Sequence, residues 1–233
     1  MIRVVAYNVS GGIEPAAAGA VLADLAPQIV CILEAPGPKR LRAIARAAKL
    51  EVAARSGRRG SGTAVLVDGD VRVRATSNVP LTTPRDVPTR EATHVILGVG
   101  GLRLSVTAVQ FGLRPEVRRA NLDELSVFLR SVDCASVVGC DLNESVRSPV
   151  AAAFAAAYQD AHAVAGSGSG LTYPTSDPST RQDFVFVDPT LTVEASHVPT
   201  SGPVAVASYH RPVVADITTP PSDTDATSDR GST

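Results

Sequence analysis

Short apolar runs rich in β-branched residues recur along the chain, and several of them end directly in a polar residue. The clearest run covers residues 135–138, and Asp141 and Asn143 follow it after a glycine and a cysteine. A run this short, without breakers, is typical of a buried strand. The two polar residues are two positions apart, so an extended backbone directs both side chains to the same face. This pattern favours a polar site at the end of a central strand, although Asp and Asn also satisfy backbone groups in ordinary turns.

The apolar runs alternate first with helical patterns and later with turns. Helices are predicted over residues 15–25, 38–49, 115–129 and 148–158. Strands are predicted over residues 2–7, 29–33, 51–54, 62–67, 71–76, 93–99, 103–109, 135–138, 181–187, 191–197 and 213–217. Asp68-Gly69 and Gly100-Gly101 are typical of hairpin turns. We therefore expect one α/β domain over residues 1–217, followed by a disordered C-terminal tail over residues 218–233.

The charge and composition exclude several classes of protein. The chain has 22 Lys and Arg against 23 Asp and Glu, a net charge of −1, so it lacks the large positive field of a non-specific nucleic-acid binder. A local basic rim is compatible with this balance. Arg55, Arg58 and Arg59 in one loop are candidates for it, although solvated surface charge explains them more simply. Aromatic residues are 4% of the chain and Trp is absent, which argues against an extensive base-stacking platform.

The sequence indicates a cytoplasmic protein. No apolar run approaches the roughly 20 residues of a membrane span. The N-terminus enters a strand pattern at once, without the features of a secretory signal. Cys31, Cys134 and Cys140 are an odd set, lie in or beside apolar runs and lack the spacing of metal ligands. We therefore expect buried, reduced thiols.

Polar residues stand at the ends of several predicted strands. Asn8 and Glu34 follow the first two strands, and His210 comes just before the last one. Asp183 lies inside an apolar strand, where a charge is costly unless it is paired. Ordinary alternatives are a turn for Asn8, an anion near a helix start for Glu34 and a structural role for His210. Because ligands in α/β proteins gather where strands end, we expect these residues and Asp141 to meet in one site.

Taken in order, these segments resemble the endonuclease/exonuclease/phosphatase superfamily, over residues 2–217. Its members have a first strand ending in Asn, a second ending in Glu, a Gly-Asp-x-Asn-like segment, an Arg-x-Asp-aromatic strand and a Ser-Asp-His-x-Pro-like end. The corresponding segments here are Val4-Val5-Ala6-Tyr7-Asn8-Val9, Ile32-Leu33-Glu34, Gly139-Cys140-Asp141-Leu142-Asn143, Arg181-Gln182-Asp183-Phe184 and Ser208-Tyr209-His210-Arg211-Pro212. Gly170-Leu171-Thr172-Tyr173-Pro174 is also similar to the family. Each segment is weak alone, but the five in this order and spacing are specific.

The resemblance implies a four-layer α/β sandwich, with two packed mixed β-sheets flanked by helices. It also implies a metal-dependent phosphoesterase, nuclease-like first of all, in which a water attacks a phosphodiester or phosphomonoester. Glu34, helped by Asn8, would bind Mg²⁺ or Mn²⁺, since few carboxylate ligands suit a hard cation that keeps its waters. Asp141 would orient or deprotonate the water, and Asn143 would hold a phosphate oxygen.

On the other side of the phosphate, the resemblance implies that His210 donates to an oxygen and that Asp183 fixes its ring. Two positions depart from the family. Tyr209 replaces the acidic residue of Ser-Asp-His, and Gln110 stands where a general-acid histidine is often found. Both can still hydrogen-bond to a substrate, but glutamine cannot deliver a proton at neutral pH. The loss of a general acid typically costs about 10²–10⁴-fold in rate.

These departures leave two functional hypotheses. The first is an active hydrolase whose leaving group needs little protonation, or receives its proton from another residue; His94 and His162 are available by sequence. The second is a catalytically weakened or inactive member that binds a phosphorylated ligand or a protein partner. For the first, we expect a monomer that takes a phosphate-ester substrate, with DNA among the candidates.

Overall fold

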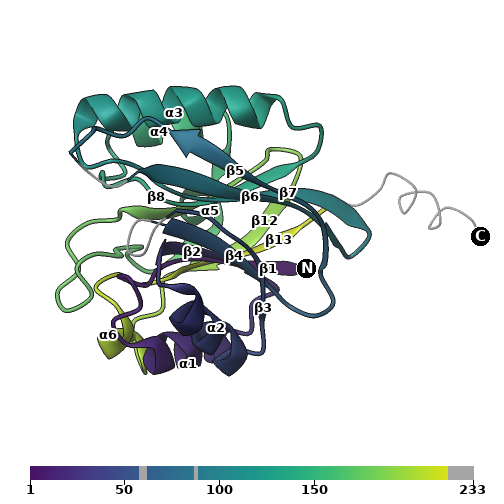
Figure 1. The fold of residues 1–233 in the computed structure, drawn as a ribbon, viewed down its shortest axis with the longest axis vertical. Helices are drawn as coiled ribbons and strands as arrows, with labels where there is room; N and C mark the ends of the chain where they lie inside the picture. The colour runs from purple at the N-terminus through teal and green to yellow at the C-terminus, as the bar shows by residue number, and fades with distance from the viewer. Residues whose placement is uncertain (58–61, 87–88, 220–233) are drawn as a thin grey trace, which may run out of the picture.

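The structure, a computed structural model, describes residues 1–57, 62–86 and 89–219. Its described residues form two mixed β-sheets packed face to face, with helices on both outer faces (Figure 1). This is the four-layer α/β sandwich expected from the sequence. Arg58, Arg59 and the predicted tail from residue 220 onward lie outside the described residues.

The two sheets are formed from strands that are far apart in the chain. Sheet A has the order β10 (Gly166–Ser167), β12 (Thr192–His197), β13 (Val213–Thr218), β1 (Ile2–Asn8), β2 (Ile29–Ala35), β4 (Gly62–Val67) and β3 (Glu51–Arg55). Sheet B has the order β5 (Arg72–Leu81), β6 (Arg90–Val99), β7 (Leu102–Gln110), β8 (Ser136–Asp141), β11 (Asp183–Val187) and β9 (Gln159–Asp160). β1 runs parallel to β2, and β7 runs parallel to β8. Each parallel pair therefore ends at one edge of its sheet.

Helices cover the outer faces of both sheets (Figure 1). Helices α1 (Pro15–Leu25), α2 (Pro38–Ala47) and α6 (Val204–Ala207) pack on sheet A, and α3 (Pro115–Arg130) and α4 (Pro149–Ala155) pack on sheet B. The short α5 (Ala161–Ala165) contacts β11 and β12. The four longest helices all begin with proline, at a position where the missing N–H has no helical partner in any case.

Three apolar cores hold the layers together. Val4 and Ala6 of β1 lie between the sheets, whereas Val5 and Tyr7 pack against the helices. Burial on both faces explains why such strands are continuous apolar runs in the sequence. Between the sheets, a Cβ added to Gly139 would lie 2.4 Å from the Cβ of Cys31. Only glycine allows the sheets to approach this closely beside the end of β8.

Most predicted elements are confirmed, with shifts at their ends. β5 is longer than expected and contains Pro80, which an edge strand tolerates, and α4 is shorter than the helix predicted over residues 148–158. The hairpin at Gly100-Gly101 is confirmed and joins β6 to β7. The hairpin predicted at Asp68-Gly69 is wrong. β4 pairs within sheet A and β5 within sheet B, so this turn carries the chain from one sheet to the other.

The prediction of buried cysteines is confirmed for two of the three. All three cysteines are free; Cys31 and Cys140 are buried, and Cys134 is half-buried. Within the described residues, no helix has the length and apolar character to cross a bilayer.

Candidate active site

Sheet B contributes three polar residues that strand register places in a row. Asp141 at the end of β8 pairs with Gln110 at the end of β7 on one side. On the other side it pairs with Asp183 at the start of β11. Paired residues in neighbouring strands place their side chains on the same face, and all three are buried. The pairing therefore sets an amide and two carboxylates side by side at the edge of sheet B.

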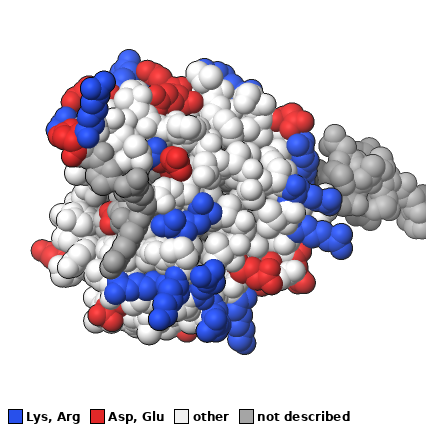
Figure 2. Space-filling model, viewed as in Figure 1, with Lys and Arg blue, Asp and Glu red and all other residues white. Residues whose placement is uncertain are grey.

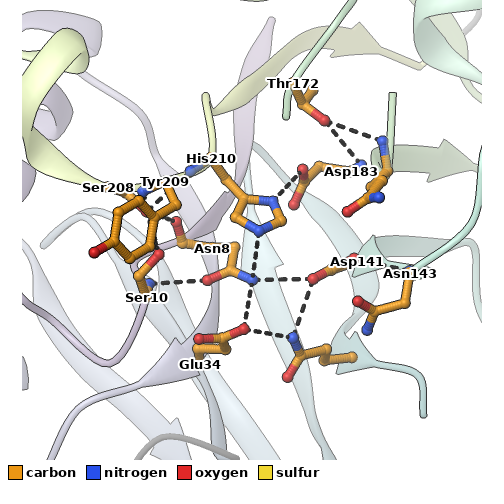
Figure 3. A network of polar contacts seen from close by, with 12 residues as sticks. Asn8, Ser10, Glu34, Asp141, Asn143, Thr172, Asp183, Ser208, Tyr209 and His210 are labelled. Carbon is orange, nitrogen blue, oxygen red and sulfur yellow. Dashed lines mark hydrogen bonds and ion pairs between the residues drawn. The ribbon is translucent and has the colours of Figure 1, made fainter. Parts of the chain in front are cut away.

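Sheet A contributes the facing groups from less regular backbone. Asn8 is the last residue of β1. Glu34 interrupts the pairing of β2 with β4, where the register shifts between Leu33 and Ala35, and its φ is 49°. A bulge of this kind redirects a side chain. Here it directs the Glu34 carboxylate toward the Asn8 amide, and His210 reaches the same place from the loop before β13 (Figure 3).

The Asn8 amide joins the two halves of the site (Figure 3). Its Nδ2 donates to Glu34 Oε1 at 3.1 Å and to Asp141 Oδ2 at 3.0 Å. The backbone N–H of Ser10 donates to Asn8 Oδ1 at 2.9 Å, which fixes the orientation of the amide. Asn8 thus holds the two carboxylates with its nitrogen, while a backbone donor occupies its oxygen.

His210 and Asp183 form a buried pair. His210 Nδ1 lies 2.8 Å from Asp183 Oδ2, and His210 Nε2 points toward Asn8 Nδ2 at 3.5 Å. Burial alone lowers the pKa of His210, but the charge of Asp183 and its hydrogen bond outweigh burial and raise that pKa to about 9. The pair therefore favours a charged imidazole at neutral pH.

Ser208 ties the His210 loop to β1. Its Oγ donates to the backbone carbonyl of Asn8 at 2.6 Å and accepts from the backbone N–H of His210 at 3.2 Å. The Ser10 hydroxyl lies 2.8 Å from Ser208 Oγ and accepts from the backbone N–H of Tyr209 at 3.2 Å. These few polar contacts set the position of the imidazole relative to sheet A.

The Gly-Leu-Thr-Tyr-Pro segment covers the other side of the imidazole. Thr172 Oγ1 accepts from the backbone N–H groups of Gln182 at 3.0 Å and Asp183 at 3.3 Å. The Tyr173 ring lies 4.7 Å from the His210 ring between centroids. This segment therefore holds the start of β11 and confines the ring of His210.

Asp141 is fully buried at the centre of the network. Its Oδ1 accepts from the backbone N–H of Asn143 at 2.9 Å, and its Oδ2 accepts from Gln110 Nε2 at 3.0 Å as well as from Asn8. Burial raises the pKa of Asp141 and the charge of Asp183 adds to it. His210 and the hydrogen bonds offset part of this rise, and the pKa is about 6.

Asn143 and Tyr209, both predicted to contact substrate, differ in their surroundings. Asn143 has a φ of 51°, and its Nδ2 donates to the backbone carbonyl of Phe111 at 2.8 Å. That bond uses one of its two amide hydrogens. The side chain of Tyr209 is 64% exposed beside His210. Tyr209 thus presents an exposed aromatic side chain next to His210 in the chain, at the position where the resemblance implied a carboxylate.

Arg90 is the residue that the sequence analysis missed. Gln110 Nε2 donates to Glu34 Oε1 at 2.8 Å as well as to Asp141, and Arg90 Nη1 donates to Gln110 Oε1 at 2.5 Å. Burial lowers the pKa of Arg90, which Asp141 and Glu34 partly offset. The Arg90 guanidinium therefore fixes the Gln110 side chain so that the amide nitrogen of Gln110 faces the two carboxylates. The Gly100-Gly101 turn could have indicated this contact. A hairpin centred there pairs Thr93 with Ala108, and the same register continued outward brings Arg90 opposite Phe111, the neighbour of Gln110.

The donor set fits a hard divalent cation. Glu34 and Asp141 present carboxylate oxygens that share neutral amide donors. Asp183 Oδ1 is buried without a hydrogen-bond partner among the described residues. Oxygen ligands of this kind are those that Mg²⁺ and Mn²⁺ prefer. One ligand atom each from Asp141, Asp183 and His210 also lie within 4.8 Å of one another, so this acidic and histidine cluster could hold a metal as well.

Neither His94 nor His162 contacts the site residues in the described part of the chain. His94 lies between Ser77 and Ser105 in sheet B, at 3.0 and 3.2 Å. His162 is the second residue of the short α5 and packs beside Gly170. Neither imidazole therefore substitutes for the proton donor that Gln110 replaces.

The fold and the site together define a class of protein: an α/β sandwich with a cluster of carboxylates and a histidine where the two sheets end. The chain belongs to the endonuclease/exonuclease/phosphatase family, whose model matches residues 5–229. Members of this family are phosphoesterase hydrolases and include phosphatases and nucleases. No curated protein matches the sequence.

Solved structures of low sequence identity share the fold. An endonuclease/exonuclease/phosphatase from Bacteroides vulgatus is 18% identical with a TM-score of 0.79, covering 94% of this chain and 99% of that chain. A mannosyl-6-phosphatase from Bacteroides thetaiotaomicron is 14% identical with a TM-score of 0.78, covering 94% and 100%. The human Nocturnin catalytic domain with bound sulfate is 16% identical with a TM-score of 0.75, covering 94% and 93%. At these identities the likeness establishes the fold.

Proposed function

We propose that the chain is a metal-dependent phosphoesterase that hydrolyses a phosphodiester or phosphomonoester, with a nuclease-like reaction as the first candidate. The observation that carries this proposal is the convergence of Glu34, Asp141 and the Asp183–His210 pair from two sheets into one network. Buried charges are costly, and a fold gains little stability from gathering them. Their meeting at the ends of strands therefore supports a chemical role.

Glu34 is the residue that would hold Mg²⁺ or Mn²⁺, with Asn8 beside it. Such a cation neutralises charge that develops on the phosphate during attack. Asn8 would act with Glu34 by holding its carboxylate through the amide nitrogen, since the Asn8 oxygen is already bonded to Ser10. This arrangement supports a positioning role for Asn8 in the proposed metal site.

The remaining groups would act on water and phosphate. Asp141 would orient the attacking water and accept its proton. His210 would donate from Nε2 to a phosphate oxygen, while Asp183 holds the ring through Nδ1. Asn143 would bind a second phosphate oxygen with its free amide hydrogen, and Tyr209 would contact the substrate at the mouth of the site.

Gln110 gives specific support to a second candidate function. Its oxygen is bonded to Arg90 and its nitrogen to two carboxylates, and an amide supplies no proton to a leaving group. An enzyme with this residue would favour substrates whose leaving group needs little protonation. Alternatively, the chain is a weakened or inactive member that binds a phosphorylated ligand or a protein partner without turnover.

A metal-dependent screen distinguishes the two candidates. Abasic DNA, plasmid DNA, sphingomyelin and inositol phosphates are incubated with the protein in Mg²⁺, in Mn²⁺ and in chelator. We expect hydrolysis of at least one substrate only with metal, and its loss in Asp141→Asn and in His210→Ala while circular dichroism shows an intact fold. A retained rate in Asp141→Asn would count against the proposed mechanism. Absence of turnover in the wild type, together with thermal stabilisation by a phosphate ligand, would favour the second candidate.

We further propose that the protein is a cytoplasmic monomer with a single domain over residues 1–217. The continuous apolar cores between and outside the two sheets support the single domain. β13 runs to Thr218, so the domain includes this residue as well.

A further inference from the structure

The outward face of α2 carries positive charge without acidic neighbours in the helix. Lys39, Arg40, Arg42 and Arg46 of α2, and Lys49 just after it, are all exposed. We call these five residues the α2 basic face. In Figure 2, Lys and Arg side chains gather over α2 at the bottom of the view. The chain as a whole has a net charge of −1, so this surface is a local positive region on a nearly neutral protein.

The α2 basic face differs from several basic residues elsewhere, which form ion pairs. Five arginines outside it form ion pairs: Arg3, Arg103, Arg114, Arg118 and Arg181. Over residues 1–57, 62–86 and 89–219, no member of the α2 basic face does so. Solvated cations scattered over a surface need no partner. Five neighbouring ones repel each other, and an anionic ligand relieves that repulsion.

Part of the α2 basic face lines a groove. Arg42, Arg46 and Lys49 line a hollow of about 830 Å³ between α2 and β3, which contains one carboxylate, that of Glu51. Arg55 lines the same hollow, and its Nε donates to the backbone carbonyl of Pro36 at 3.2 Å. Pro36 follows Glu34 by two residues. One end of the groove is therefore linked through Arg55 to the segment that follows Glu34, and the groove runs along α2 from there.

We propose that the groove between α2 and β3 binds the phosphate backbone of a nucleic-acid strand that extends from the active site. The claim that this strand is a substrate rests on the proposed function, whereas the binding itself does not. Three cations along one side of a helix suit a chain of regularly spaced phosphates. The exposed residues between them are Ala43 and Ala47. These side chains are too small to insert into a bilayer, which favours a nucleic acid over an anionic membrane surface.

Binding of single-stranded oligodeoxythymidylate, measured by fluorescence anisotropy in chelator over a range of salt concentrations, tests this proposal. The test variant is Arg42→Gln/Arg46→Gln/Lys49→Gln. The matched control, Arg72→Gln/Arg74→Gln/Arg119→Gln, removes the same charge from exposed sites outside the groove. We expect the slope of log affinity against log salt to fall in magnitude by about 2 in the test variant, at about 0.7 for each lost phosphate contact, and to stay near the wild-type value in the control.

The other outcomes of this experiment would overturn the proposal. Equal losses in both variants would show a non-specific effect of net charge, and an unchanged slope in the test variant would show that the groove makes no phosphate contacts. Binding to phosphatidylserine vesicles without binding to the oligonucleotide would identify a membrane surface instead. Because chelator removes the metal, the result is independent of turnover. Failure of the proposed hydrolysis and failure of this groove are therefore separate results.

Discussion

The two sheets form their halves of the site in different ways. Sheet B aligns Gln110, Asp141 and Asp183 through the register of three regular strands. Sheet A presents Glu34 from a bulge and His210 from a loop. Regular pairing fixes a side chain through many backbone bonds, whereas a loop depends on a few individual contacts. Substitutions in the sheet B half should therefore lower the catalytic rate and leave the backbone in place. Substitutions on the sheet A side should instead displace the catalytic side chain itself.

Among residues that position other groups, the largest expected effect is at Gln110 in the sheet B half. Gln110→Met removes the donor shared by Glu34 and Asp141, and Arg90→Met frees the amide to rotate. Each should lower kcat by about 10–100-fold, as is typical for groups that orient metal ligands. Because Arg90 acts through Gln110, the double variant should be no slower than Gln110→Met. The measurement is kcat for all four proteins at saturating metal.

Arg90→Lys is the matched control for this cycle, since lysine keeps the charge and a donor. We expect it to retain most of the rate. Losses that multiply in the double variant would show that Arg90 acts independently of Gln110. Unfolding in any of the variants would contradict the rigid backbone that we attribute to sheet B.

A smaller effect is expected on the sheet A side, at Ser208. Ser208→Ala leaves the carbonyl of Asn8 and the N–H of His210 without their partner. The free energy of unfolding should fall by about 1–3 kcal/mol, and kcat by about tenfold because the imidazole is misplaced. Ser196→Ala, which removes a buried hydroxyl bonded to Val214 in the same sheet, should lower stability without lowering kcat. Equal losses of kcat in Ser208→Ala and Ser196→Ala would show that the contacts of Ser208 stabilise the sheet without positioning the His210 imidazole.

Much of the sheet B half could be predicted from the sequence, because Asp141 and Asp183 stand out against apolar strands. The ends of the first two strands likewise pointed to Asn8 and Glu34. The direction of the Asn8 amide and the bulge at Glu34 could not be predicted, since both depend on contacts between segments distant in sequence. Asp68-Gly69 illustrates the same limit. Its residues specify a turn, but strands that are apolar on both faces do not indicate which sheet the chain enters next.

The smallest expected effect compares two buried histidines, one in each half of the fold. Burial lowers the pKa of His94 in sheet B, whereas Asp183, despite burial, raises that of His210 to about 9. The unfolded chain titrates near about 6.5 in both cases. The contribution of His94 to the free energy of unfolding is therefore present above that pH. It is lost as the pH falls through the pKa of His94 in the folded protein, which is lower than in the unfolded chain. The contribution of His210 is present below about 6.5 and is lost as pH rises through about 9.

Urea unfolding of the metal-free protein at a series of pH values measures this difference. In His94→Gln the loss of stability on the acid side should be shallower than in the wild type, because the group that prefers to stay neutral has been removed. The alkaline side should be unchanged, since His210 is intact. If both proteins lose stability equally on acidification, His94 does not carry the acid-side dependence. That result would contradict the prediction that the two histidines contribute pH dependences of opposite sign to the stability.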